Sequence, residues 1–283
     1  MCSLVFVLVP LDDATMKSIT SRENPFFKQL VKLEESARQR RTSGLTLLDG
    51  AHLINAYHAA LGLPESLIVG ESGCESAEIK RLLTKLGSKE TVDVVVLSDA
   101  LFREVSPVKT PTGIIALIPI PAPGAIKVSA CGDESFCVLL EAIQDPGNLG
   151  SILRSAAAAG AGDAWLSSGC ADAWSPKTLR AAMGAHFLLR IHEQADLPKV
   201  AREFNGKVIA TMLKAKTSLY QTRLTGPVAF VLGNEGMGLS EAILKEATAQ
   251  VTIPMPGGTE SLNAAAAAAV CFFERVRQSE AGV

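Results

Sequence analysis

The stretch "QDPGNLGSILRSAAAAG", residues 144–160, decides the fold of the second half of the chain. It follows "SFCVLLEAI", residues 135–143, an apolar run typical of a buried strand. Its proline–glycine pair favours a turn, Asn148 favours a helix N-cap, and Gly160 favours a helix end after the alanines. We therefore predict a strand, a turn and a helix, with Arg154 facing the open end of the turn.

The same alternation of strand and helix runs along most of the chain. Apolar runs that predict strands lie at residues 45–50, 65–70, 91–98 and 113–120 in the first half, and at 135–143, 163–168, 206–213, 226–233 and 250–255 in the second. Helical patterns lie between most of them. We predict a small α/β domain followed by a larger one with a mostly parallel sheet, covered on both faces and binding ligands at the carboxyl ends of its strands.

Prolines and a glycine in "PIPAPGA" favour a linker between the two halves. We predict an extension at residues 1–16, a first domain at 17–118, a linker at 119–133 and a second domain at 134–283. The opening "MCSLVFVLVP" is too short to cross a bilayer and lacks a basic segment, so no membrane association is predicted.

Composition sets further bounds. The chain has 283 residues, 48% of them hydrophobic, and a formal net charge of −2. Attraction to nucleic acid must therefore come from local clusters of charge. The six cysteines form no C-x-x-C pair and have no histidines at metal-ligand spacing beside them, which predicts reduced thiols, a cytoplasmic location and no metal.

Two later loops also combine glycines with polar residues. In "VLGNEGMGLSEAI" a buried strand meets three glycines, yet the loop matches neither common phosphate-binding motif. Glu235 within it would repel phosphate but can hold an arginine or accept a hydrogen bond from a hydroxyl. In "IPMPGGTESLNAAAAAAVCFFE" a strand gives way to two glycines, Ser261, Asn263 and a helix with six alanines. Ordinary turns and a buried helix are the alternatives, but they leave Ser261 and Asn263 unexplained.

The segment from Lys17 to Arg41 is locally basic, with seven lysines and arginines against three glutamates. Apolar residues after Pro25 follow a helical spacing, so the basic residues lie on the opposite face. The segment is either a solvated helix face or a surface for RNA phosphates.

Taken in order, the three glycine-containing segments resemble the three motifs of the SpoU-type RNA ribose 2′-O-methyltransferases, a branch of the SPOUT superfamily. "SPKTLRAAMGAHF", residues 175–187, resembles the segment between the first two motifs. The N-terminal half resembles a small RNA substrate-binding domain related in fold to certain ribosomal proteins. Ala182 and Ala265 depart from the family, which usually has serine there. The resemblance implies that the second domain forms a deep trefoil knot, a topology that general rules make improbable.

The resemblance further implies an enzyme that transfers the methyl group of S-adenosylmethionine to a ribose 2′-hydroxyl of structured RNA. Large-subunit ribosomal RNA is favoured as the substrate, with transfer RNA as an alternative. The principal rival is a non-catalytic RNA-binding or ribosome-assembly factor of the same fold. A nucleotide-dependent oxidoreductase is a second rival, disfavoured because the dinucleotide fingerprint is missing. Family members normally form homodimers, and we expect one here.

Individual roles follow from the matched motifs. Catalytic and substrate-side roles are implied for Asn148, Arg154, Glu235, Ser261 and Asn263. Cofactor contacts are implied for Leu232, Gly233, Asn234, Gly236, Ile253, Met255 and Leu262. We predict RNA contacts by Arg22, Lys28, Arg38, Lys177 and Arg180. Arginine stays protonated in proteins. This disfavours, but leaves open, the mechanism in which Arg154 is the general base, because its guanidinium would first have to lose a proton. In the other mechanism, Arg154 holds a phosphate and polarises the hydroxyl while a water or phosphate oxygen takes the proton.

Overall fold

A computed structural model describes residues 17–87, 92–126, 135–234 and 236–280. The chain divides into two compact units, the first formed by residues up to 58 and 62–119, and the second by residues 120 onward together with 59–61. The predicted extension at 1–16 and residues 127–133 of the predicted linker lie outside the described residues. Within the described ranges, no helix is both long and apolar enough to cross a membrane.

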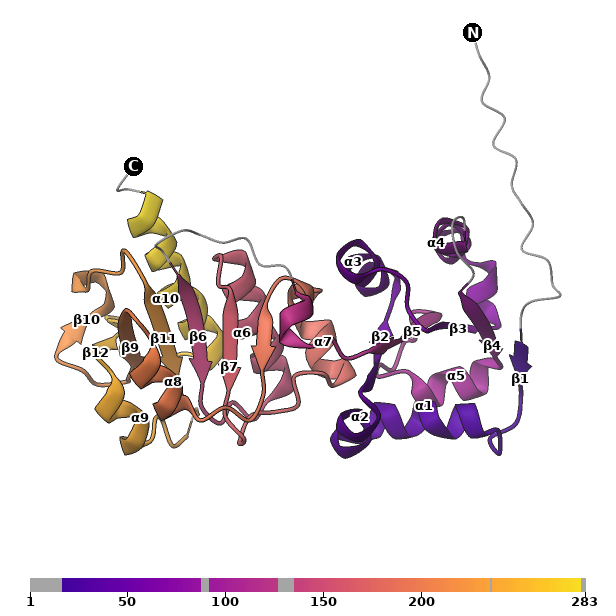
Figure 1. Ribbon diagram of the computed structural model, residues 1–283, viewed down its shortest axis with the longest axis horizontal. Coiled ribbons are helices and arrows are strands. Elements are labelled where there is room, and N and C mark those ends of the chain that lie inside the picture. Colours follow the sequence, from indigo (N-terminus) through magenta and orange to yellow (C-terminus); the bar gives the residue numbers. More distant parts are fainter. Residues whose placement is uncertain (1–16, 88–91, 127–134, 235, 281–283) are drawn as a thin grey trace, which may run out of the picture. The chain divides into compact units, whose positions relative to one another are not determined.

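The first unit is built on a five-stranded sheet in the order β1-β4-β3-β5-β2 (Figure 1). β1, β4 and β3 run parallel, and β5 is antiparallel to both of its neighbours. The strands are β1 (Lys17–Ile19), β2 (Leu45–Asp49), β3 (Ser66–Gly70), β4 (Asp93–Leu97) and β5 (Ile114–Pro119). The helices are α1 (Pro25–Glu35), α2 (Ala37–Ser43), α3 (Ala51–Leu61), η2 (Ser72–Glu75), α4 (Ala77–Gly87) and α5 (Asp99–Val105).

The core of this unit lies between the sheet and the pair α1 and α5, which occupy one face while α3 and α4 lie on the other (Figure 1). The apolar stripe predicted after Pro25 forms α1, whose Phe27, Leu30 and Leu33 are buried. Asn24 caps this helix, because its side-chain oxygen accepts a hydrogen bond from Phe26 N at 2.9 Å. The basic residues of α1 are left on its exposed face.

The second unit contains a seven-stranded sheet in the order β10-β12-β9-β11-β6-β7-β8, with every neighbouring pair parallel. The strands are β6 (Phe136–Leu140), β7 (Asp163–Leu166), β8 (Arg190–His192), β9 (Lys207–Thr211), β10 (Thr217–Ser218), β11 (Val228–Leu232) and β12 (Ala249–Thr252). The helices are η3 (Pro123–Ala125), α6 (Pro146–Ala158), α7 (Pro176–Ala182), η4 (Ala185–Phe187), α8 (Leu197–Glu203), η5 (Leu219–Gln221), α9 (Glu241–Glu246) and α10 (Ala264–Glu280).

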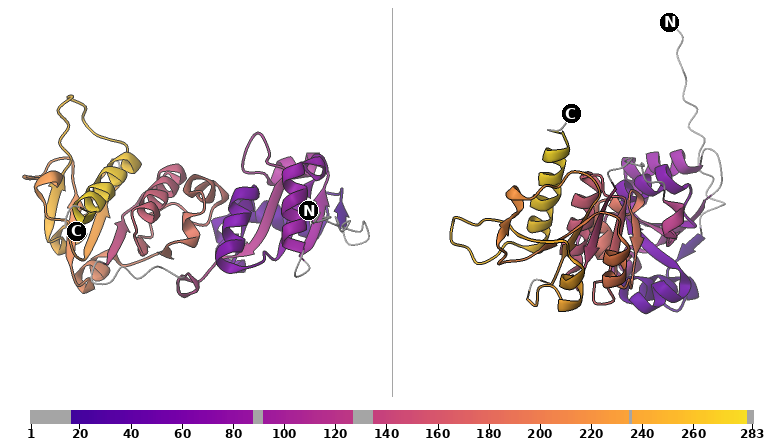
Figure 2. Two further views of the ribbon diagram at one scale, coloured as in Figure 1. Left: turned by 90° about the horizontal axis from the view of Figure 1, so that it is seen from above. Right: turned by 60° about the vertical axis from the view of Figure 1, so that its left-hand side comes forward.

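Helices cover both faces of this sheet. α8 and α9 pack on one face through Leu197, Ala201 and Ile243. On the other face the ring of Phe272 from α10 lies 5.5 Å from that of Phe136 and 5.7 Å from that of Phe230. α6 lies beside α10 on that face, as the left view of Figure 2 shows. Each strand therefore needs apolar residues on both sides, which explains its continuous apolar run.

The fold confirms the predicted α/β class and the parallel sheet of the second half. The long apolar runs all contain strands at or within a few residues of their predicted positions. The sequence analysis did not predict β1, β8, β10, α5 or α8. These elements have between two and seven residues, too few for a periodic pattern. The trefoil knot stays a prediction.

Candidate active site

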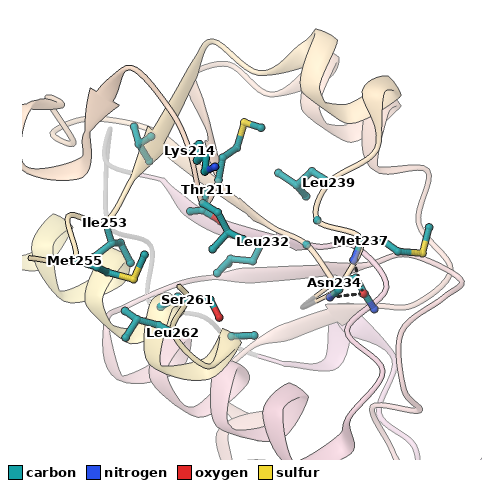
Figure 3. A pocket seen from close by; sticks show the side chains of 18 residues that line it. Thr211, Lys214, Leu232, Asn234, Met237, Leu239, Ile253, Met255, Ser261 and Leu262 are labelled. Atoms are coloured by element: carbon teal, nitrogen blue, oxygen red, sulfur yellow. Dashed lines mark hydrogen bonds between the residues drawn. The ribbon is translucent and has the colours of Figure 1, made fainter. Parts of the chain in front are cut away.

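A cavity of about 440 Å³ lies at the carboxyl ends of β9, β11 and β12 in the second unit. Residues from 211–214, 232–239, 251–255 and 261–267 line it (Figure 3). The first three segments end or follow the three strands, and the fourth leads into α10. Small-molecule sites are concave and mostly apolar, and parallel sheets hold them at this edge. The cavity therefore has the position and character of a ligand site.

Every residue for which the resemblance implied a cofactor contact lines this cavity. These residues are Leu232, Gly233, Asn234, Gly236, Ile253, Met255 and Leu262. They come from two loops, one after β11 and one between β12 and α10, so only the folded chain brings them together. Ser261, predicted on the substrate side, also lines the cavity.

A hydrogen bond joins the first and third motifs. Asn263 Nδ2 donates to Asn148 Oδ1 at 2.9 Å, across 115 residues of sequence. Asn263 Oδ1 accepts from the backbone N of Ala265 and Ala266 at the start of α10. The same side chain therefore caps α10 and fixes the position of Asn148 beside it.

Three side-chain hydrogen bonds attach the second motif to the end of β6. Ser240 donates to Glu141 twice, from its backbone N and from its hydroxyl, both at 2.7 Å. Asn234 Nδ2 donates to the carbonyl oxygen of Ala142 at 3.0 Å. Ala142 has φ 53°, an unusual backbone conformation for a residue with a side chain. The sequence analysis missed Glu141, and the only signal was an acidic residue directly after a buried strand.

The second motif forms a loop too tight for a side chain at its first glycine. A Cβ placed on Gly233 would lie 2.5 Å from the carbonyl oxygen of Gly238. Inside the loop, Asn234 Oδ1 accepts from the backbone N of Gly236 and Met237. The glycine thus allows the close backbone approach that shapes one wall of the cavity. Glu235, predicted as catalytic, lies outside the described residues.

The start of α6 differs from the prediction made for Asn148. The N-cap is Asp145, whose side chain accepts a hydrogen bond from Asn148 N at 2.7 Å. The helix begins one residue later at Pro146, because proline suits the first helical position. Asn148 therefore lies in the first turn, and its side chain is used for the contact with the third motif.

Arg154 lies on α6 six residues after Asn148, is exposed, and does not line the cavity. Gly150, one turn before it, packs against α7 so closely that an added Cβ would lie 2.5 Å from the carbonyl oxygen of Thr178. The structure therefore brings Asn148, Ser261 and Asn263 to one end of the second unit. Arg154 lies further along the helix.

The residues predicted to contact RNA lie in different electrostatic settings. Arg22 pairs with Glu104, with a 2.8 Å hydrogen bond from Nε to Oε1. Lys28 pairs with Glu23, and this hydrogen bond lowers the pKa of the Glu23 carboxyl. Arg38 is exposed on α2. On α7, Lys177 is exposed and Arg180 is half-buried.

Burial shifts the pKa values of three side chains in the second unit. Burial raises the pKa of Cys137 and of Cys271 to about 12, so both thiols stay protonated at neutral pH. His186 is fully buried, and this burial lowers its pKa to about 4. The described residues contain no group of three or more His, Cys, Asp or Glu side chains arranged to hold a metal ion.

Solved structures with the same architecture are RNA methyltransferases. One is described as an RNA 2′-O ribose methyltransferase; it is 30% identical, has a TM-score of 0.79, and the match covers 93% of this chain and 99% of that one. Another is the SpoU methyltransferase AviRb from Streptomyces viridochromogenes in complex with AdoMet. It is 26% identical, has a TM-score of 0.78, and the match covers 92% of this chain and 100% of that one.

Sequence relatives extend over nearly the whole chain. An uncharacterized tRNA/rRNA methyltransferase of Synechocystis is 33% identical over 273 residues, which cover 92% of this chain and 94% of that protein. The 23S rRNA (guanosine(2553)-2'-O)-methyltransferase RlmP of Bacillus subtilis is 30% identical, over 91% of this chain and 98% of that protein.

Two family models match, one for each half of the chain. Residues 24–116 match the MRM3-like substrate binding domain. Residues 135–273 match the SpoU rRNA Methylase family. Together with full-length relatives at 30% identity and above, these matches show that the chain belongs to the SpoU rRNA methylase family.

Proposed function

We propose that this protein transfers a methyl group from S-adenosylmethionine to a ribose 2′-hydroxyl of RNA. The observation that carries the proposal is the joining of three loops around one cavity, with the Asn263–Asn148 hydrogen bond across 115 residues. Family membership supports the reaction. The solved AviRb complex with AdoMet supports the cofactor.

The cavity fits the cofactor. Its volume of about 440 Å³ lies in the range of small-molecule sites, and its walls are largely apolar. The tight turn at Gly233 has no side chain, so a flat base can approach its backbone closely. When bound, S-adenosylmethionine supplies an activated methyl group, so the protein needs only to align the acceptor hydroxyl and help remove its proton.

The polar residues around the cavity suit this alignment. Asn148 and Asn263 hold one another beside the start of α10, which fixes two amide groups near the cavity. Ser261 adds an exposed hydroxyl on the lining. Arg154 carries a positive charge that can hold a phosphate of the substrate, and Glu235 is available to orient its guanidinium. The proton of the 2′-hydroxyl then passes to a phosphate oxygen or a water; Arg154 can take it only if its guanidinium has first released a proton to solvent.

Ribosomal RNA of the large subunit is the proposed substrate class. The first unit matches a substrate-binding domain, and the Bacillus relative is named for a guanosine of 23S rRNA. Transfer RNA is the alternative substrate, because the Synechocystis relative is named for either RNA.

The active form proposed here is a homodimer with a knotted second unit. Three side-chain hydrogen bonds tie residues 141–142 to the loop at 234–240, which supports a path in which distant loops wrap one another. α10 leaves Ala266 and Phe273 exposed, and small residues beside an aromatic ring suit close contact with a second helix. A strictly monomeric species at micromolar concentration in light scattering would contradict the dimer.

The decisive experiment combines calorimetry with methyl transfer. The purified protein should bind S-adenosylmethionine and transfer its labelled methyl group to total RNA. Mapping of ribose methylation in cells with and without the protein then identifies the nucleotide. Binding without transfer to any RNA would favour the non-catalytic RNA-binding or ribosome-assembly factor. Absence of binding would reject the cofactor assignment.

A further inference from the structure

One charged side chain lines the cavity in the part of the chain that the structure describes. It belongs to Lys214, three residues after the end of β9. Figure 3 shows Lys214 on the same side of the cavity as Thr211, away from Ser261 and Leu262. A single ammonium group beside otherwise uncharged walls would attract an anionic group of a ligand.

Thr211 and Asn234, two further polar residues of the lining, already have partners within the fold, whereas Ser261 contributes an uncharged hydroxyl. The Thr211 hydroxyl donates to the carbonyl oxygen of Val231 at 3.0 Å. Asn234 uses its oxygen for two backbone N–H groups of its own loop and its nitrogen for Ala142. Among the described residues, no acceptor bonds the Lys214 ammonium. Lys214 is therefore free to bind a ligand.

The chemistry of the proposed cofactor identifies the group that would meet it. S-adenosylmethionine carries a sulfonium cation, an ammonium cation and one carboxylate, and only the carboxylate is attracted to a lysine. An ionised carboxylate left unpaired beside apolar walls is unfavourable. We propose that Lys214 pairs with the carboxylate of the cofactor's methionine portion, an inference that rests on the proposed function. Lys214 thereby becomes a specificity residue for the intact amino-acid end of the cofactor.

The exposure of the Lys214 side chain sets the expected size of its effect on cofactor affinity. Lys214 is exposed, so water and salt screen the pair. We expect the pair to change the dissociation constant by about two- to fivefold, as for a solvent-exposed ion pair. The effect should shrink as ionic strength rises.

The test removes one charge from each partner in turn. Lys214→Met keeps the length of the side chain and removes its charge, and decarboxylated S-adenosylmethionine lacks only the carboxylate. Titration calorimetry of the full chain gives four dissociation constants. We expect Lys214→Met to weaken binding of S-adenosylmethionine about two- to fivefold. Binding of the decarboxylated ligand should stay unchanged or tighten, because a repulsive cation is removed.

Lys216→Met is the matched control, since Lys216 is exposed two residues further on and does not line the cavity. It should leave both affinities unchanged. Equal weakening of both ligands by Lys214→Met, or no weakening of either, would overturn the pairing. Weaker RNA binding with unchanged cofactor affinity would assign Lys214 to a phosphate and also overturn it. If the wild-type chain binds neither ligand, the proposed function itself fails.

Discussion

The two units use their polar side chains in different ways. In the second unit, Asn263 bonds Asn148 across 115 residues and Ser240 bonds Glu141 across 99. In the first unit, the buried Arg40 donates to the carbonyl oxygens of Leu33 and Glu34, only seven and six residues away, and so braces neighbouring helices. The long-range bonds of the second unit hold together the loops beside the cavity. The first unit also has long-range side-chain bonds, such as that from Arg22 to Glu104 across 82 residues, but this bond is exposed and its partners do not line the cavity.

We infer from this difference that the second unit holds the catalytic groups and that the first contributes to RNA recognition. A catalytic site needs groups held in fixed positions by the fold, and bonds between distant loops provide that. Contacts with RNA phosphates need only exposed charge, which a helix surface supplies without long-range bonds. Changes in the second unit should therefore affect turnover and cofactor binding, and changes in the first should affect RNA affinity.

Arg154→Lys should have the largest effect. Lysine keeps the positive charge but loses the planar fork that binds a phosphate at two points. We expect turnover to fall by about a thousandfold, as when an electrostatic group is lost from an active site. The affinity for S-adenosylmethionine should be unchanged, because Arg154 does not line the cavity. Single-turnover methyl transfer alongside calorimetry measures both, and a wild-type rate would reject either mechanism that uses the guanidinium.

The sequence predicts the longer strands of both units because most of their residues are buried. Runs such as residues 136–140 and 228–232 are wholly apolar, and a buried strand is the simplest structure for them. β8 has three residues and β10 has two, so they are too short for a recognisable sequence pattern. They form because they pair with neighbouring strands.

The site residues also divide into those that a local sequence pattern reveals and those that depend on contacts with distant residues. Glycine and asparagine at strand ends mark loops that bind ligands, and the resemblance supplied the cavity-lining positions. The role of Glu141 depends on Ser240 approaching from 99 residues away, which no local pattern records. The local sequence likewise gives no sign of the pairing of Arg22 with Glu104, 82 residues away. Asn148 was assigned to the wrong position in its helix because Asp145 was not weighed as the cap.

Acid should destabilise the second unit through His186. This residue is neutral in the folded state because burial lowers its pKa to about 4, while an unfolded histidine has a pKa of about 6.5. The unfolded state therefore takes up a proton first, and stability present above pH 6.5 is lost as the pH falls toward 4, by about 3 kcal/mol. Urea unfolding followed by tryptophan fluorescence reports this unit, since both tryptophans, Trp165 and Trp174, lie in it.

His186→Gln supplies the comparison for that measurement. Glutamine has a nitrogen that can still donate to the carbonyl oxygen of Ala173, but it does not titrate. The slope of unfolding free energy against pH between 4 and 6.5 should be shallower in this variant. Equal slopes in the two proteins would show that other groups cause the acid sensitivity.

Gly233→Ala tests whether the tight loop shapes the cavity. The added Cβ would lie 2.5 Å from the carbonyl oxygen of Gly238, so the loop must open. We expect a loss of about 1–3 kcal/mol in stability, as in other overpacked sites, together with weaker cofactor binding. Gly257→Ala is the control, because nothing lies within 4 Å of its added Cβ. If both variants bind the cofactor equally well, the loop does not form the binding wall.

Glu141→Gln should have a smaller effect on the same loop. Glutamine keeps one acceptor for Ser240 but loses the second acceptor and the charge, which we expect to cost about 1–2 kcal/mol. Both unfolding free energy and cofactor affinity should fall. Glu246→Gln, which breaks the solvated pair with Arg202, should cost less than about 1 kcal/mol and leave cofactor affinity intact. Equal effects in the two variants would remove the special role of Glu141.

The smallest effect is expected in the first unit, in the salt dependence of RNA binding. Arg38 is exposed, so its contact with a phosphate would release about one counterion. Arg38→Gln should therefore lower the slope of log affinity against log salt by about one, with methyl-transfer rates unchanged at saturating RNA. Arg22 already pairs with Glu104 and must give up that partner to reach a phosphate, so Arg22→Gln should change the slope less. Equal slopes of log affinity against log salt for the two variants would mean that the Arg22–Glu104 pair opens freely when RNA binds. Pairing within the first unit would then not determine which of its cations contact RNA.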